Sequence, residues 1–220
     1  MTRTLIVGAS GGIGGALVTH LQTRGEDVTS LSRSADGLDL TDAESVMQVM
    51  GQLHGSYDRI IVATGALSGD TQGPEKTLKS LDPGAIAAQF ALNATGPLLV
   101  LKYALRLMPR DRRAVFAALS ARVGSIGDNR LGGWYSYRAS KAALNQLIHT
   151  AAIEVARSHR QAICVALHPG TVATAFTRNY RNHDCVTPAQ AAARLINVTD
   201  ALGVAQTGQF LDWAGQPVPW

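Results

Sequence analysis

The chain has few charged residues and no dense run of one sign, which argues against a surface built for nucleic acid. Charged residues make up 16% of its 220 residues, the net charge is +4, and no five consecutive residues carry the same charge. The densest basic patch closes a helical segment, where cations complement the helix dipole, at Arg106, Arg110, Arg112 and Arg113. We therefore expect no nucleic-acid partner.

The chain is also poor in cysteine and in long apolar runs. Its two cysteines differ in setting, since Cys164 lies in an apolar strand-like run and Cys185 in a polar loop. This favours reduced thiols and a cytoplasmic protein. No run of eighteen apolar residues occurs, and the start of the chain lacks an apolar stretch of signal length, so we expect no membrane partner.

What the chain does contain is an alternation of short apolar runs with helical patterns. Seven runs are typical of strands, at residues 5–7, 28–32, 37–40, 59–63, 114–119, 162–167 and 209–213. No linker or low-complexity tract separates them. The pattern predicts one α/β domain over residues 1–220, a doubly wound Rossmann domain with a parallel sheet of about seven strands and helices on both faces.

A glycine-rich turn follows the first strand and leads into a helical pattern. It contains Gly8, Ser10, Gly11, Gly12, Ile13 and Gly14. The backbone amides of such a turn can approach a phosphate, and the following helix N-terminus adds partial positive charge. The turn indicates dinucleotide binding, with a tight turn of small packing residues as the alternative.

Two further strand ends fit a dinucleotide. Arg33 follows the second strand, where an arginine favours the 2′-phosphate of NADP over the 2′-hydroxyl of NAD. An ordinary exposed arginine is the alternative. The strand over residues 59–63 ends in the small residues Ala63, Thr64 and Gly65, which would let a cofactor lie against it.

A long helix is predicted over about residues 82–107, with an interruption inside it. Asparagine is a mediocre helix former at Asn93, and Pro97 lacks the amide hydrogen that the carbonyl of residue 93 needs. A freed carbonyl facing a cleft can hold a water molecule, although a simple kink would explain the same residues.

Tyr137 and Lys141 lie four residues apart in a helical pattern and so share one helix face. A cation roughly 4–5 Å from the phenol is worth on the order of 4 kcal/mol at an effective dielectric of about 20, which is enough to bring the pKa of Tyr137 from ~10 toward neutrality. The phenol could then exchange protons with a carbonyl or an alcohol. Ser120 closes the strand over residues 114–119, at the strand end where parallel sheets bind ligands.

Taken in order, these motifs resemble the short-chain dehydrogenase/reductase family over essentially the whole chain, and most of all its small carbonyl-reductase and C-factor-like branch. Val7 replaces the threonine of the family's glycine motif, and Ala63-Thr64-Gly65 is a reduced form of its Asn-Asn-Ala-Gly. The family's Pro-Gly-x-Val-x-Thr is intact as Pro169, Gly170, Val172 and Thr174.

The resemblance implies a catalytic tetrad of Asn93, Ser120, Tyr137 and Lys141. Ser120 stands seventeen residues before Tyr137, whereas the family's serine usually stands thirteen before it, so Ser125 at twelve is the rival. Ser120 is preferred because it closes a strand. The resemblance also places the cofactor on the glycine turn, on Arg33, Asp39, Leu40 and Ala63–Gly65, on Tyr137 and Lys141, and on the Pro169–Thr174 segment, which holds the nicotinamide.

The activity that the resemblance implies is NADPH-dependent reduction of a ketone or aldehyde, reversible as alcohol oxidation, with NAD(H) less favoured. Ser120 would bind the carbonyl oxygen, Tyr137 would donate the proton, Lys141 would lower the pKa of Tyr137 and bind the ribose, and Asn93 would anchor a water. We expect Leu131, Trp134 and the loop 175–187 to line the substrate pocket. A homodimer or homotetramer is expected, with a monomer left open. The alternative function is a cofactor-binding signalling or regulatory protein with little turnover.

Overall fold

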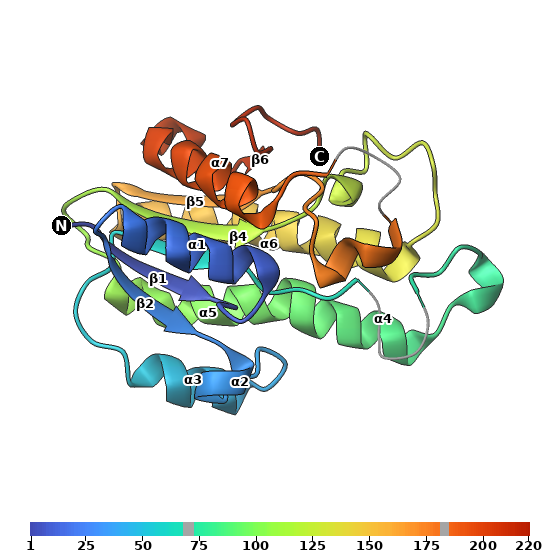
Figure 1. Ribbon diagram of the computed structural model, residues 1–220, viewed down its shortest axis with the longest axis horizontal. Helices are drawn as coiled ribbons and strands as arrows, with labels where there is room; N and C mark the ends of the chain where they lie inside the picture. Colours follow the sequence, from blue (N-terminus) through green and yellow to red (C-terminus); the bar gives the residue numbers. More distant parts are fainter. Residues whose placement is uncertain (68–72, 181–184) are drawn as a thin grey trace.

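The fold is an open sheet of six parallel strands between two layers of helices. Figure 1 shows the computed structural model, which describes residues 1–67, 73–180 and 185–220. The sheet order is β2-β1-β3-β4-β5-β6. The strands are β1 (Arg3–Val7), β2 (Asp27–Leu31), β3 (Arg59–Val62), β4 (Ala114–Leu119), β5 (Ala162–Leu167) and β6 (Phe210–Leu211). The chain runs outward from β1 to β2 and then returns to the other side of β1, so the strand order reverses between β1 and β3, the position where doubly wound sheets bind ligands.

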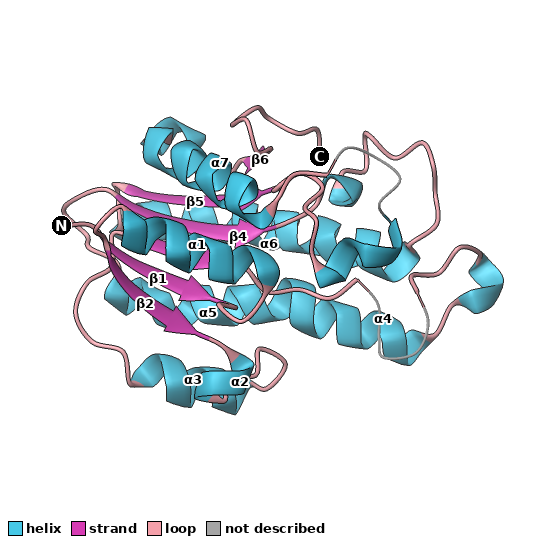
Figure 2. Cartoon of the chain, in the orientation of Figure 1, coloured by secondary structure: helices cyan, strands magenta, loops and turns pink. Residues whose placement is uncertain are grey.

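Alternate strand residues face two separate cores, as expected of strands covered on both faces. Leu5 and Val7 belong to the core under α3 (Ala43–Gly51), α5 (Gly96–Ala104) and α6 (Tyr135–Ser158). Ile6 belongs to the core under α1 (Gly12–Thr23) and α7 (Pro188–Ala201). Figure 2 shows the two helical layers on either side of the strands. The predicted doubly wound architecture is confirmed.

The strand predicted over residues 37–40 is absent, so the sheet has six strands rather than about seven. Gly37 adopts a left-handed conformation with φ 68° and ends the short helix α2 (Arg33–Asp36). The hydroxyl of Ser45 then donates to the Gly37 carbonyl at 2.9 Å and accepts from the Asp39 amide at 2.9 Å. One side chain therefore takes the backbone groups that a neighbouring strand would need.

The long helix predicted over residues 82–107 is present and is interrupted where predicted. It consists of α4 (Pro83–Phe90), a π-helical turn (Ala91–Thr95), α5 and a final 3₁₀ turn (Leu105–Leu107). Pro97 cannot donate to the carbonyl four residues earlier, and the wider π turn fits the backbone to that loss. By length and composition Pro83–Leu107 is the one helix of the described chain that could cross a membrane. In this fold its Val100, Leu101 and Ala104 are buried in the core.

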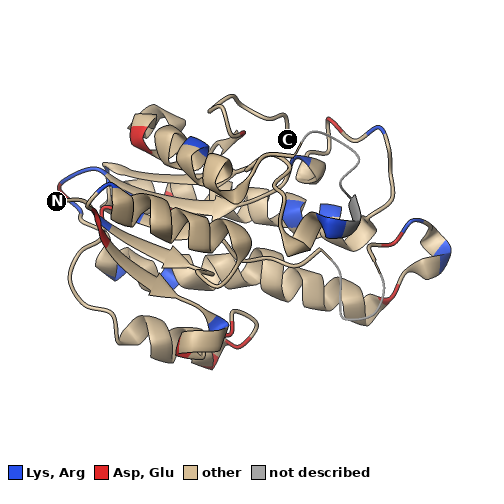
Figure 3. Cartoon of the chain, in the orientation of Figure 1, with Lys and Arg blue, Asp and Glu red and all other residues tan. Residues whose placement is uncertain are grey.

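One cluster of charged residues lies at the amino ends of the strands, near the start of the chain (Figure 3). Arg59, the first residue of β3, is buried and pairs with Glu26 at 2.9 Å and with Asp200 of α7. Arg24 also pairs with Asp200 at 2.9 Å. A buried arginine needs such partners because an unpaired buried charge is costly.

Candidate active site

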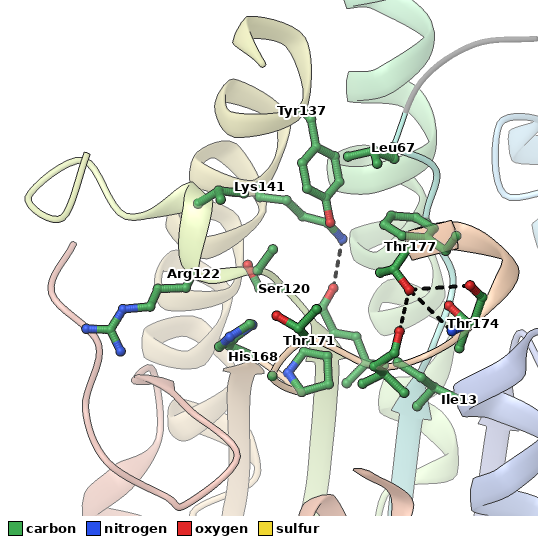
Figure 4. Close-up of a pocket in the computed structure, with 18 of the residues that line it drawn as sticks. Ile13, Leu67, Ser120, Arg122, Tyr137, Lys141, His168, Thr171, Thr174 and Thr177 are labelled. Atoms are coloured by element: carbon green, nitrogen blue, oxygen red, sulfur yellow. Dashed lines mark hydrogen bonds between the residues drawn. The ribbon is translucent and has the colours of Figure 1, made fainter. Parts of the chain in front are cut away.

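A cavity of about 830 Å³ opens at the carboxyl ends of β1, β3, β4 and β5. Figure 4 shows it bounded by α6 on one side and by the segment after β5 on another. The predicted site residues that line it are Ser10, Gly11, Gly12, Ile13, Ala63, Thr64, Gly65, Ser120, Tyr137, Lys141, Pro169, Gly170, Val172 and Thr174. Leu131, Trp134 and residues 175–177 also line it, as expected for the substrate pocket. Residues 181–184 of the expected loop lie outside the described residues.

The glycine turn after β1 has room for no side chains at three positions. A Cβ on Gly8, whose φ is 92°, would lie 2.8 Å from Thr64 Cγ2. A Cβ on Gly14 would lie 2.1 Å from the Gly8 carbonyl oxygen, and one on Gly12 would lie 2.6 Å from Thr174 Cγ2. Gly8 and Gly14 thus pack the turn rather than line the cavity, whereas Gly12 keeps the cavity open between the turn and Thr174.

The start of α1 suits an anion. Gly11 precedes the helix without a side-chain cap, and the first turn carries no acidic residue. The first amides of a helix carry partial positive charge and need acceptors, so this end of α1 can receive a phosphate.

Polar atoms inside the cavity also call for a ligand. Thr64 Oγ1 and His168 Nδ1 are buried there without a hydrogen-bond partner among the described residues. Buried polar atoms in proteins are normally satisfied, so a polar ligand would complete them. The residues present therefore fit a dinucleotide cofactor.

Three predicted cofactor residues lie outside the cavity, beyond the end of β2. Arg33 begins α2 and is exposed. The carboxylate of Asp39 accepts the amide and the hydroxyl of Thr41 at 2.8 and 2.7 Å, and these bonds, aided by the charge of Arg33, hold its pKa below the ordinary range. Leu40 is buried against Gly96, where a Cβ would lie 2.7 Å from Leu40 Cβ. Asp39 and Leu40 thus have structural contacts of their own.

Helix α6 brings Tyr137 and Lys141 together on its buried face. Their relative exposures are 6% and 3%, and Lys141 Nζ lies 5.9 Å from the centre of the Tyr137 ring. The ammonium donates to the Leu119 carbonyl at the end of β4, at 2.8 Å. Both polar ends point into the cavity (Figure 4).

The pKa expectation for this pair is wrong for the arrangement observed. Burial raises the pKa of Tyr137 above its ordinary value, and burial lowers the pKa of Lys141 to about 7. The expectation counts the attraction between the two groups at an effective dielectric of about 20 and omits the cost of taking either charged form out of water. In the cavity wall desolvation disfavours both charged forms and outweighs their attraction.

Asn93 lies behind the cavity wall rather than in it. Its Oδ1 accepts from the Ala66 amide and its Nδ2 donates to the Ala66 carbonyl, both at 2.9 Å. Asn93 Oδ1 and Lys141 Nζ lie 3.1 and 3.5 Å from the position that a Cβ would take on Gly65. Asn93 therefore holds the segment after β3 beside Lys141, and its anchoring of a water remains a prediction.

Of the two candidate serines, the structure places Ser120 in the cavity. Its amide donates to the Leu167 carbonyl at 2.8 Å, and its hydroxyl donates to Asn145 Oδ1 at 2.6 Å. Ser125 is buried away from the cavity, where its hydroxyl accepts from the Asp128 amide at 3.1 Å. Position therefore favours Ser120.

Sequence reasoning missed several polar residues of the cavity, His168 and Arg138 among them. His168 is half-buried, and burial, followed by the charge of Arg122, lowers its pKa to about 4, so the ring is neutral at physiological pH. Its place directly after β5 was the available signal. Arg138 donates to the carbonyls of Gly133 and Val123 at 3.0 and 3.2 Å, and ties two loops together. No signal in the sequence indicates that Arg138 bonds to these two carbonyls.

The fold and the cavity define a Rossmann-type protein with a Tyr–Lys pair at the ligand edge of its sheet. Residues 35–184 match the family model of short chain dehydrogenases. The chain belongs to the short-chain dehydrogenase/reductase family, whose members are oxidoreductases, and the resemblance read from its motifs is confirmed.

Three similar proteins illustrate the range of the family. The 1-hydroxy-2-glutathionyl-2-methyl-3-butene dehydrogenase of Rhodococcus sp. (strain AD45) is 34% identical over 236 residues, which cover 100% of both chains. The C-signal protein of Myxococcus xanthus is 33% identical over 144 residues, 65% of this chain and 83% of that protein. The NADPH-bound carbonyl reductase from chicken fatty liver shares the fold, with a TM-score of 0.86 at 23% identity, over 100% of this chain and 99% of that one.

Proposed function

We propose that this protein is an NADPH-dependent oxidoreductase that reduces a ketone or aldehyde and, in reverse, oxidises an alcohol. The observation that supports it most is the placement of Tyr137, Lys141 and Ser120 in the wall of one cavity that also contains the glycine turn. When bound, the nicotinamide supplies or accepts the hydride. The start of α1 would hold the pyrophosphate of the cofactor. Lys141 would hold the ribose of the cofactor, and Pro169–Thr174 would hold its nicotinamide.

The protonation states of the pair suit the reductive direction. Because the pKa of Tyr137 is raised, the phenol keeps its proton at neutral pH and can donate it to a carbonyl oxygen. Lys141, with a pKa of about 7, is partly protonated there and can stabilise the tyrosinate that donation leaves.

The preference for NADPH is supported by Arg33. This residue is exposed at the end of β2, where the adenosine ribose of a dinucleotide lies in such folds, and its charge contributes to the lowered pKa of the nearby Asp39. An arginine there can pair with a 2′-phosphate.

The test is a screen of NADPH oxidation against ketones and aldehydes, followed by Tyr137→Phe. In the reverse direction, the reduction of NADP⁺ is measured with a glutathionyl alcohol, because the Rhodococcus relative is named for one. The Phe variant should bind NADPH as the wild type does and lose turnover by a factor of ~10²–10⁴. Normal turnover by the Phe variant would refute the proposal.

The second candidate, supported by the similarity to the C-signal protein, is a cofactor-binding regulatory protein with little turnover. It predicts tight NADPH binding with no turnover on any member of the panel.

We also propose a cytoplasmic homodimer or homotetramer. The buried thiol of Cys164 supports a reducing compartment, and the exposed Ile153 on α6 supports an interface between copies. Light scattering on the purified protein tests the oligomeric state.

A further inference from the structure

Helix α6 is joined to the end of β4 by two side chains, only one of which belongs to the expected tetrad. Tyr137, Lys141 and Asn145 follow one another at intervals of four residues, so they share the buried face of the helix. Lys141 donates to the Leu119 carbonyl, and one turn further along Asn145 Oδ1 accepts the hydroxyl of Ser120 at 2.6 Å.

The bond to Asn145 uses the only hydrogen of the Ser120 hydroxyl. A serine hydroxyl carries one donor hydrogen and two lone pairs. A carbonyl oxygen of a substrate only accepts, so a serine that donates to Asn145 cannot also donate to the substrate. Ser120 and Asn145 are 4% and 2% exposed, so the bond between them is almost fully enclosed by protein.

The other end of the Asn145 amide shows how this conflict can be resolved. Asn145 Nδ2 is buried and has no hydrogen-bond partner among the described residues. A half-turn of the amide exchanges Oδ1 and Nδ2 with almost no change in shape. Nδ2 would then donate to Ser120 Oγ, and the hydrogen of Ser120 would be free to point into the cavity.

We propose that Asn145 is a positioning residue that acts through Ser120: its amide donates to Ser120 Oγ in the reacting arrangement and directs the serine hydrogen to the carbonyl oxygen of the substrate. This inference rests on the proposed reductase function. Asn145 itself does not line the cavity, so it acts on the reaction only by way of the serine.

The test compares two variants of nearly the same shape. Asn145→Asp, as a carboxylate, can only accept and should hold the serine hydrogen, lowering kcat ~10- to 100-fold. Asn145→Leu neither donates nor accepts, leaves the serine hydrogen free, and should lose less. The KM for NADPH should change less than ~3-fold in both. Gln146→Glu adds the same charge on the exposed neighbouring residue and should leave kcat unchanged.

A double-mutant cycle with Ser120→Ala separates this role from a structural one. In the Ser120→Ala background the Asn145 substitutions should have no further effect on kcat. If the Asp variant does not fold, the cycle with the Leu variant decides. Two results would overturn the inference about Asn145 without touching the proposed function. One is a loss of kcat that persists unchanged in the Ser120→Ala background, and the other is an Asp variant as active as wild type. A wild type with no turnover would overturn the proposed function as well.

Discussion

The buried ammonium of Lys141 should make the protein less stable than it would be with a neutral residue at that position. The pKa of Lys141 is lowered from its ordinary 10.5 to about 7 by burial. The unfolded chain therefore binds more protons than the folded protein between pH 7 and 10.5, and stability from this group rises with pH across that window. Linkage puts the cost of the buried charge at about 5 kcal/mol at pH 6 and about 2 kcal/mol at pH 9.

Substituting Lys141→Met removes the charge and keeps a side chain of similar length. The variant should be more stable than wild type at pH 6, with about 1–3 kcal/mol of the gain offset because the Leu119 carbonyl loses its donor. That loss is the same at every pH. The advantage of the variant should therefore shrink by about 2–3 kcal/mol between pH 6 and pH 9.

Urea unfolding of both proteins at the two pH values measures this difference directly. Lys102→Met is the matched control, because Lys102 is exposed on α5 and its substitution should give the same small difference at both pH values. A Lys141→Met advantage that does not change with pH would show that the ammonium is not desolvated, and the argument would fail. Activity should be lost in the Lys141 variant at either pH.

Three further predictions concern the cofactor, the serine and the loop before α6. Arg33→Asp should raise the Kd for NADPH ~10-fold or more and leave that for NADH within a few-fold, by fluorescence titration; equal weakening of both would remove Arg33 from the 2′-phosphate site. Ser120→Ala should lower kcat by ~10²–10³, as expected for one donor to a developing oxyanion, whereas Ser125→Ala should change Tm rather than kcat. Trp134 has φ 54°, a left-handed conformation that strains any residue with a Cβ. The free energy of unfolding of Trp134→Gly should therefore be about 1 kcal/mol higher than that of Trp134→Ala, which loses the same indole but keeps the strain. Equal stabilities of the two variants would argue against that strain.

The strands, the glycine turn and the helix with Tyr137 could be predicted because their signals are local. Apolar runs, glycine at a strand end and a spacing of four residues are visible in the sequence and need no tertiary information. The interruption at Pro97 was also local, since the missing amide is a property of the residue itself.

The missed features depend on neighbours from elsewhere in the chain. Leu38 and Leu40 alternate like a strand, but Ser45 takes the backbone groups that a strand partner would need. The pKa of Tyr137 depends on how deeply α6 is buried, which a spacing cannot show. The contact between Ser120 and Asn145 joins residues 25 apart in the chain, and nothing in either segment indicates the other.

The π turn at Ala91–Thr95 lets the two halves of one long helix face different neighbours. Its first half, α4, packs on α6 beside the cavity, and its second half, α5, packs on α3 and β3 in the core. Each residue advances a helix by about 100°, so deleting one residue from the turn would rotate one half against the other by that angle. Either Asn93 would leave Ala66 or the apolar stripe of α5 would turn toward solvent. In this segment, insertions and deletions must therefore preserve the rotation of α4 relative to α5 about the helix axis, rather than the length of the helix.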